Sequence, residues 1–212
     1  MTKKLIVFIL ILSLSLSSVV YASDSVIFDV LNINGVSDDN ETITRGEYIS
    51  MVAKIMNLDT NSAIQISPYK DIDENHAYIA DVNALSDLGI INGDSNGNVY
   101  PDEPVTWNQA IKIILSAMGY SVLCEASGGY PAGYVSIANR INLTENIGYE
   151  GDSNLSYDNA IALLWNAVDI NIYEQSGYGT SQKFEVSDET LLSRYHNIYK
   201  TVLQQYALLY IQ

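Results

Sequence analysis

The stretch AYIADVNALSDLGIINGDSNGNVYPDEPVTWNQAIKIILSAM, residues 77–118, decides the fold of this chain. It predicts a helix, a Gly-Ile-Ile-Asn-Gly turn, a polar loop with Gly and Pro, a capping Thr and a second apolar helix. The same order recurs in divergent form, as VIFDVLNINGVSDDNETITRGEYISMVAKIM at 26–56 and as YVSIANRINLTENIGYEGDSNLSYDNAIALLWNAV at 134–168. A helix pair repeated in this way predicts units that bury their apolar faces against one another.

The chain is therefore divided into three units joined by short loops, at residues 24–60, 68–121 and 128–170, of which the third is the most degenerate. Residues 171–187 contain Ser-Gly-Tyr-Gly and are predicted to be a linker. Residues 188–212 are predicted to form a C-terminal helix. Because the sequence stops after this helix, we expect either a truncated reading frame or a stand-alone module. We expect an all-α fold built from three helix-pair repeats and this last helix.

The N-terminus has the three parts of a secretory signal peptide, over residues 1–22. Two lysines precede an apolar stretch at 5–20, and Val20 and Ala22 are small residues at the cleavage-determining positions, so the mature chain is expected to start at Ser23. The apolar stretch is short for a membrane anchor, and no later stretch approaches the ~20 apolar residues of a spanning helix. We expect a secreted protein that is not embedded in a membrane after cleavage.

The composition excludes several partners and activities. The formal net charge is -15, with 10 Lys+Arg against 25 Asp+Glu, which argues against nucleic acid and anionic membrane surfaces as partners. Cys124 is the only cysteine, so no intramolecular disulfide can form. The only histidines, His76 and His196, lie in different segments, and no catalytic motif occurs, so we expect no enzyme and no cofactor. The run 94–98 resembles a calcium loop but lacks its Gly and Glu positions, so no metal site is expected.

Residues 24–170 resemble the S-layer homology domain, the three-repeat module that attaches proteins to Gram-positive-type cell walls. The resemblance rests on LGIINGDSNGNVYPDEPVT at 88–106 and on Ile-Thr-Arg-Gly-Glu at 43–47, which is similar to the family's Thr-Arg-Ala-Glu signature. The Tyr-Pro-Ala-Gly-Tyr turn at 130–134 is similar to the clostridial branch. The resemblance implies three units around a pseudo-threefold axis, with a groove between each neighbouring pair.

The same resemblance implies attachment to the cell wall through a secondary cell-wall polysaccharide, often with pyruvylated sugars, whose carboxylate meets the signature Arg. That role transfers to Arg45 alone, because Trp107 and Tyr157 stand at the matching positions of the other units. The alternative is a degenerate module that serves as a structural or protein-interaction domain, with other surface proteins as partners. Either function places the protein at the cell wall or S-layer surface.

The candidate glycan contacts are Arg45, Thr44, Glu47, Trp107 and Asp71. Arg45 is predicted in the first turn of a helix, where it could grip a carboxylate in two places or form a salt bridge with a nearby acid. Thr44 and Glu47 have the spacing of a capping box, which favours a structural role. Trp107 could stack on a sugar ring or pack between units. Asp71 lies in the turn before the first helix of the second unit.

Overall fold

The computed structural model describes residues 41–60 and 66–196. The predicted signal peptide at 1–22, the first predicted helix of the first unit and the part of the C-terminal helix after residue 196 lie outside the described residues. The described helices are α2 (Arg45–Ile55), α3 (Ile79–Asp87), α4 (Trp107–Ala117), α5 (Ser121–Ala126), α6 (Ala132–Arg140), α7 (Tyr157–Asp169) and α8 (Leu191–His196), with a 3-10 turn at Gly179–Ser181.

The expectation of an all-α fold is wrong. Strands β1 (Asn171–Gln175) and β2 (Phe184–Thr190) form an antiparallel hairpin in the segment predicted to be a linker and in the start of the predicted C-terminal helix. The strands carry β-branched and aromatic residues on both sides of the Gly-rich turn, which is the composition of a hairpin. As a consequence α8 begins at Leu191, and the structure is mixed α and β.

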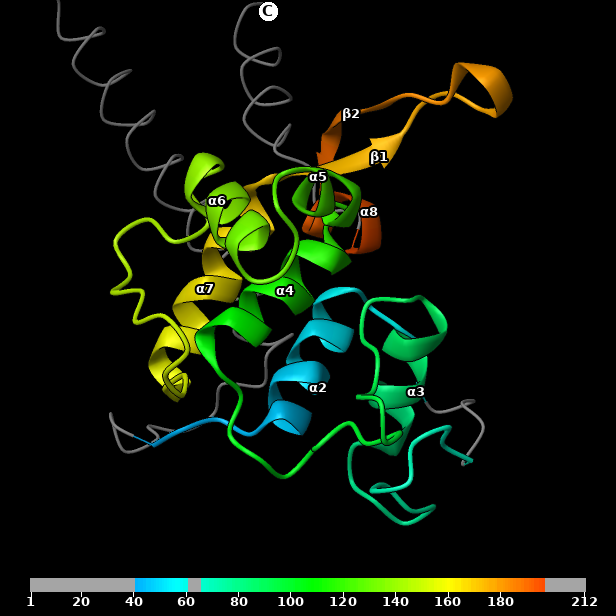
Figure 1. The fold of residues 1–212 in the computed structure, drawn as a ribbon, viewed down its shortest axis with the longest axis vertical. Helices are drawn as coiled ribbons and strands as arrows, with labels where there is room; N and C mark the ends of the chain where they lie inside the picture. Colours follow the sequence, from blue (N-terminus) through cyan, green and yellow to red (C-terminus); the bar gives the residue numbers. More distant parts are fainter. Residues whose placement is uncertain (1–40, 61–65, 197–212) are drawn as a thin grey trace, which may run out of the picture.

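The hairpin extends from one end of the helices and is held at the end of α4 (Figure 1). The Tyr120 hydroxyl donates to the Asn171 carbonyl at 2.8 Å, and the Tyr120 ring stacks on Tyr173 with centroids 5.3 Å apart. Gly119, at a φ of 82°, permits this contact, because a Cβ there would lie 2.0 Å from the Tyr173 carbonyl oxygen. The hairpin base is thus packed against the helical core.

The second helices of the three units form the centre of the molecule. Helices α2, α4 and α7 contact one another, while α3 packs on α2 and α6 packs on α4 (Figure 1). Each central helix begins after a hydroxyl cap, and the side chain of each cap accepts a hydrogen bond from the backbone N–H three residues later, at Thr44, Thr106 and Ser156. These caps fix where the three helices start.

A closed ring of backbone hydrogen bonds joins the residues that precede the three caps. The Ile43 N–H donates to the Leu155 carbonyl at 3.1 Å, Leu155 N–H to Val105 at 2.8 Å, and Val105 N–H to Ile43 at 3.0 Å. A second cyclic set comes from the first helical residues, with bonds from Arg45 to Glu103, from Trp107 to Ser153 and from Tyr157 to Glu41. The three helix starts are therefore equivalent in space, and each lies against the loop of a neighbouring unit.

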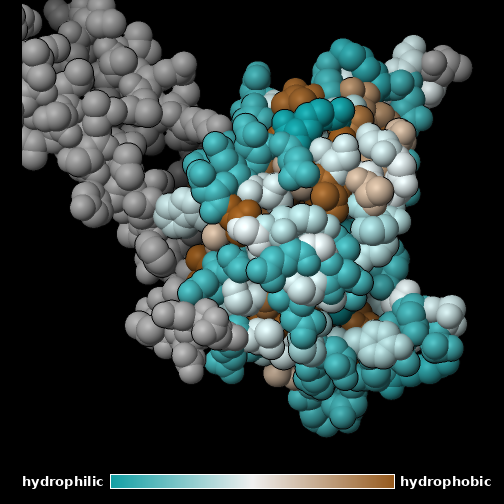
Figure 2. Space-filling model, turned by 60° about the vertical axis from the view of Figure 1, so that its left-hand side comes forward, coloured by the Kyte–Doolittle hydropathy of each residue, from teal (hydrophilic) through white to brown (hydrophobic). Residues whose placement is uncertain are grey.

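Figure 2 shows one face that is mostly hydrophilic, with apolar residues in small separate areas. Cys124 is buried, which fits a small core residue. None of the helices in the described part of the chain has the length and apolarity needed to cross a membrane.

Candidate functional site

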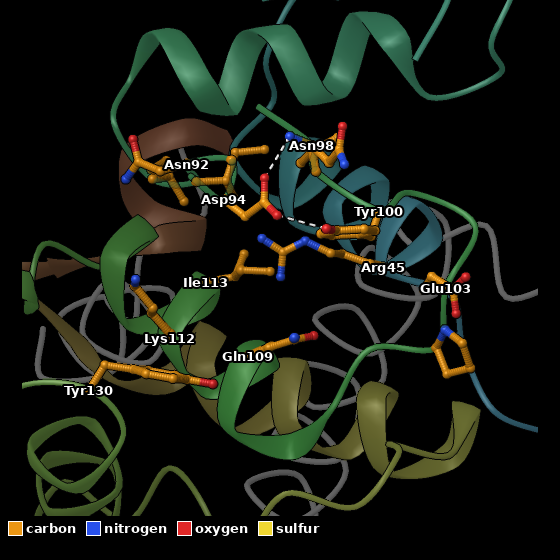
Figure 3. Close-up of a pocket in the computed structure, with 15 residues that line it drawn as sticks. Arg45, Asn92, Asp94, Asn98, Tyr100, Glu103, Gln109, Lys112, Ile113 and Tyr130 are labelled. Carbon is orange, nitrogen blue, oxygen red and sulfur yellow. Dashed lines mark hydrogen bonds between the residues drawn. The ribbon is translucent and has the colours of Figure 1, made fainter. Parts of the chain in front are cut away.

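A cleft of about 340 Å³ lies between the start of α2 and the second unit (Figure 3). Arg45 of α2 forms one wall of the cleft. The opposite wall is formed by α4, through Gln109, Lys112 and Ile113. The loop at 90–100 closes one side, and Tyr130 from the turn before α6 lies at the end near Lys112. The cleft thus combines two cations, polar amides, tyrosine rings and an apolar floor.

Arg45 is placed by the backbone of both units. Its own N–H donates to the Glu103 carbonyl at 2.8 Å, and the next N–H, of Gly46, donates to the Pro101 carbonyl at 2.7 Å. These bonds join the first turn of α2 to the loop before α4. Because they involve only main-chain groups, they position the Arg45 side chain without occupying it.

The Arg45 guanidinium extends into the cleft (Figure 3). Its Nε is buried and has no hydrogen-bond partner, and none of the ion pairs among residues 41–60 and 66–196 involves Arg45. Burial lowers the pKa of the Arg45 guanidinium, while Tyr130, Tyr69 and Asp71 act in the opposite direction. The salt-bridge alternative is therefore not what the structure shows. A buried donor without a partner has unused capacity for an acceptor.

Thr44 and Glu47 form the predicted capping box. The Thr44 N–H donates to Glu47 Oε2 at 2.8 Å, and the Glu47 N–H donates to Thr44 Oγ1 at 3.2 Å. The Thr44 hydroxyl also donates to Glu47 Oε2 at 2.8 Å. Both side chains are thus engaged in starting α2, and neither lines the cleft. Their structural role is confirmed.

Asp71 supports the loop that borders the cleft. Its carboxylate accepts hydrogen bonds from the N–H of Val99 at 2.9 Å and of Tyr100 at 2.7 Å. Tyr100 has a φ of 53°, a left-handed conformation that a non-glycine residue adopts only when its surroundings fix it. The structure places Asp71 behind the loop and not in the cleft.

Asp94 organises the same loop from its other end. Its carboxylate accepts from the Asn96 and Asn98 N–H groups, each at 2.9 Å, and from the Tyr100 hydroxyl at 2.7 Å (Figure 3). The bonds from Asn98 and Tyr100 are the main causes that lower the pKa of Asp94 to about 2. Asp94 therefore stays ionised at neutral pH with its oxygens already used by the loop. No group of three metal-ligating side chains occurs in the described residues.

Trp107 is not available to a ligand. Its side chain is 1% exposed and forms a T-shaped contact with the Tyr149 ring, with centroids 6.0 Å apart and an interplanar angle of 83°. This burial agrees with the packing alternative and leaves Trp107 without the exposed ring face that a sugar platform needs. The exposed aromatic side chains at the cleft are Tyr100 and Tyr130, at 44% and 45%.

Sequence reasoning missed Lys112, Gln109 and Tyr130. Gln109 forms the capping box of α4 with Thr106 and also lines the cleft. Tyr130 was interpreted as part of a turn. The signal that could have found Lys112 is its isolation, since it is the only charged residue of the helix WNQAIKIILSA.

Comparison with known proteins identifies the domain at this site. Residues 68–106 match the S-layer homology domain. The chain is 28% identical over 164 residues to the "Middle cell wall protein" of Brevibacillus brevis and 27% identical over 166 residues to the "Surface layer protein" of Brevibacillus choshinensis, which in each case is 76% of this chain. It is 28% identical over 141 residues, 62% of the chain, to the "Cell surface protein" of Thermoanaerobacter kivui.

The matched regions are only 15%, 14% and 18% of these relatives' lengths. The chain thus contains an S-layer homology domain, and its relatives are named as cell-wall, surface-layer and cell-surface proteins. These findings support a location at the cell surface and a role in cell-surface anchoring in general. The match includes the loop at 90–100 that borders the cleft.

Proposed function

We propose that this chain attaches non-covalently to the cell wall by binding a carboxylate-bearing secondary cell-wall polysaccharide in the cleft beside Arg45. The observation that carries this proposal is the buried Arg45 Nε, which has no hydrogen-bond partner among residues 41–60 and 66–196 and lies at the wall of an open cleft. A guanidinium can hold a carboxylate through two parallel hydrogen bonds, and such charged bonds are about twice as strong as neutral ones. A pyruvylated sugar supplies this carboxylate.

The remainder of the cleft has the chemistry of a sugar site. Tyr100 and Tyr130 offer exposed aromatic rings, and the side chains of Asn92 and Gln109 offer amide donors and acceptors around the same space (Figure 3). Aromatic rings with polar edges suit a ligand that has both apolar faces and hydroxyl groups. In this proposal Tyr100 and Tyr130 take the place first assigned to Trp107.

We propose that the polysaccharide binds at the Arg45 cleft and not at the two equivalent helix starts. The helix starts equivalent to Arg45 carry Trp107, which is buried, and Tyr157, which is half-buried. Without several equivalent contacts, the affinity gain of multivalent attachment is absent. The same observation favours a second candidate, a degenerate module that binds other surface proteins instead of glycan.

Co-sedimentation with purified clostridial cell-wall sacculi tests the proposal. The chain lacking residues 1–22 is mixed with intact sacculi and with sacculi whose secondary polymer has been removed by acid. We expect binding to intact sacculi only. Arg45→Ala should weaken it by about 10- to 100-fold, since a hydrogen bond to a charged group contributes about 1.5–3 kcal/mol. Arg45→Lys should restore part of it, because charge remains and the paired geometry is lost.

Arg140→Ala is the matched control, because Arg140 is an exposed arginine in the last turn of α6 and does not line the cleft. It should bind as the wild type does. Equal binding to stripped sacculi would refute the polysaccharide as ligand and support the protein-interaction candidate. If Arg45→Ala binds sacculi as strongly as the wild type, wall attachment stands, but the cleft beside Arg45 is refuted as the binding site.

A further inference from the structure

The cleft contains a second cation that the proposal above does not use. Lys112 reaches the cleft from α4, on the wall opposite Arg45 (Figure 3). Its Nζ lies 5.2 Å from the centroid of the Tyr130 ring and 6.0 Å from that of Tyr134. No acid in the part of the chain that the structure describes lies within ion-pair distance of it.

The cleft brings two cations together, and neither forms an ion pair with an acid among the described residues. Lys54, Lys70 and Arg140 also form no ion pair in the described part of the chain, so what distinguishes Arg45 and Lys112 is that both border the same 340 Å³ cleft. Tyrosine rings hold the ammonium group at the rim through cation–π contacts, which leave its N–H donors free for an anion.

Tyr130 connects the two cations. Its ring lies next to the Lys112 ammonium group, and its hydroxyl points into the cleft (Figure 3). Burial and Asp152 raise the pKa of the Tyr130 hydroxyl, whereas Arg45 lowers it, so the guanidinium acts on the same phenol. Tyr130 therefore lies within electrostatic reach of both positive groups.

The acids that line the cleft do not neutralise this pair. Asp94 accepts hydrogen bonds from the loop backbone and from Tyr100, and Glu103 lies beside Pro104, away from the guanidinium end of Arg45 (Figure 3). A ligand with one carboxylate could pair with one cation and would leave the other uncompensated. A ligand with two carboxylates could pair with both.

We infer that Lys112 is a second anion contact, positioned by Tyr130, and that the ligand is an acidic glycan with two carboxylates that span the cleft from Arg45 to Lys112. This inference rests on the proposed function, and it specifies the ligand. A sugar ring between the two carboxylates would lie against Tyr130. The cleft would then select a polymer with carboxylates on nearby sugars over one that carries an isolated acidic group.

The test compares Lys112→Gln and Lys112→Arg with the wild type in sacculus binding over a series of NaCl concentrations. We expect Lys112→Gln to weaken binding about tenfold and to make its salt dependence shallower, because one screened charge contact is lost. Lys112→Arg should keep the affinity and the salt dependence of the wild type, because the positive charge remains. Tyr130→Phe should bind nearly as the wild type does, because its ring still supports the ammonium group. Tyr130→Leu removes both this support and the ring proposed to contact the sugar, so it should show the shallower salt dependence of Lys112→Gln and bind more weakly than that variant. Melting temperatures establish that each variant is folded.

Lys54→Gln is the control, because Lys54 is an exposed lysine near the end of α2 and does not line the cleft. If Lys112→Gln binds with unchanged affinity and salt dependence while Arg45→Ala does not bind, the inference is overturned and the proposed function stands. If the wild type does not bind sacculi, both are overturned. Carbodiimide amidation of the wall carboxylates should abolish the difference between wild type and Lys112→Gln. Persistence of that difference on amidated walls would refute carboxylates as the groups bound.

Discussion

The substitution Gly46→Ala introduces the residue of the family signature and should nevertheless destabilise this chain. Gly46 lies in the first turn of α2, next to Arg45. A Cβ at this position would lie 2.4 Å from Cδ2 of Tyr78 and 2.9 Å from the Pro101 carbonyl oxygen. Carbon atoms in contact normally lie about 3.5–4.0 Å apart, so the Tyr78 ring would have to move by about 1 Å.

Two opposing effects determine the magnitude. Replacing Gly by Ala inside a helix contributes about 0.5–1 kcal/mol of stability. Forcing an extra carbon into a packed site costs about 1–3 kcal/mol. A further loss follows if Pro101 retreats, because its carbonyl accepts the Gly46 N–H at 2.7 Å and such a bond contributes about 1 kcal/mol. The overlap is the larger effect, and the expected net loss is about 1–2 kcal/mol.

The measurement is urea denaturation followed by circular dichroism, with thermal melting beside it. A loss of that size lowers the melting temperature by about 2–8 °C in a chain of this length. Gly148→Ala is the control, because a Cβ there meets nothing within 4 Å. In a Tyr78→Ala background, Gly46→Ala should cost less, since the larger overlap is removed. A melting temperature of Gly46→Ala at or above the wild type would refute this reasoning.

Three further predictions concern the elements around the cleft. Thr44→Ala removes the side-chain cap of α2 and should cost about 1 kcal/mol in urea denaturation. Asp71→Asn weakens the carboxylate contacts to the Val99 and Tyr100 N–H groups, and we expect lower sacculus binding without loss of the helical circular dichroism signal. Asp94 has a folded pKa of about 2 against an ordinary value of 3.8, so its stabilisation is present above the ordinary value and is lost as pH falls toward 2. Asp94→Asn should therefore show a smaller stability loss than the wild type when denaturation is compared at pH 5 and pH 2.5.

The helix starts were predictable because their signals are local. Thr44 and Glu47 lie three residues apart, and Thr106 and Gln109 repeat that spacing, so the caps could be identified without tertiary information. The hairpin at 171–190 was missed because its turn residues also suit a linker, and its strands became recognisable only through their pairing across the turn.

The cleft was predictable only in part, because its residues come from distant segments. Arg45 could be proposed from its place in a helix start and from the family signature. Lys112 and Tyr130 enter the same cleft through the packing of α6 on α4, which no local pattern specifies. Trp107 has the same local position as Arg45, and its burial in the folded chain, at 1% exposure, shows that it is core.

The rings of backbone hydrogen bonds explain how these equivalent positions can differ so much. The three helix starts are joined through N–H and carbonyl groups, so their geometry does not depend on which side chain follows each cap. An apolar ring at that position can fill the space between units, as Trp107 does, and such burial stabilises the fold. A guanidinium at the same position leaves a buried donor without a partner, as at Arg45, which costs stability unless a ligand supplies the acceptor. Under the proposed function, the ligand carboxylate would supply that acceptor at the start of α2, while the equivalent position of α4 carries the packed Trp107.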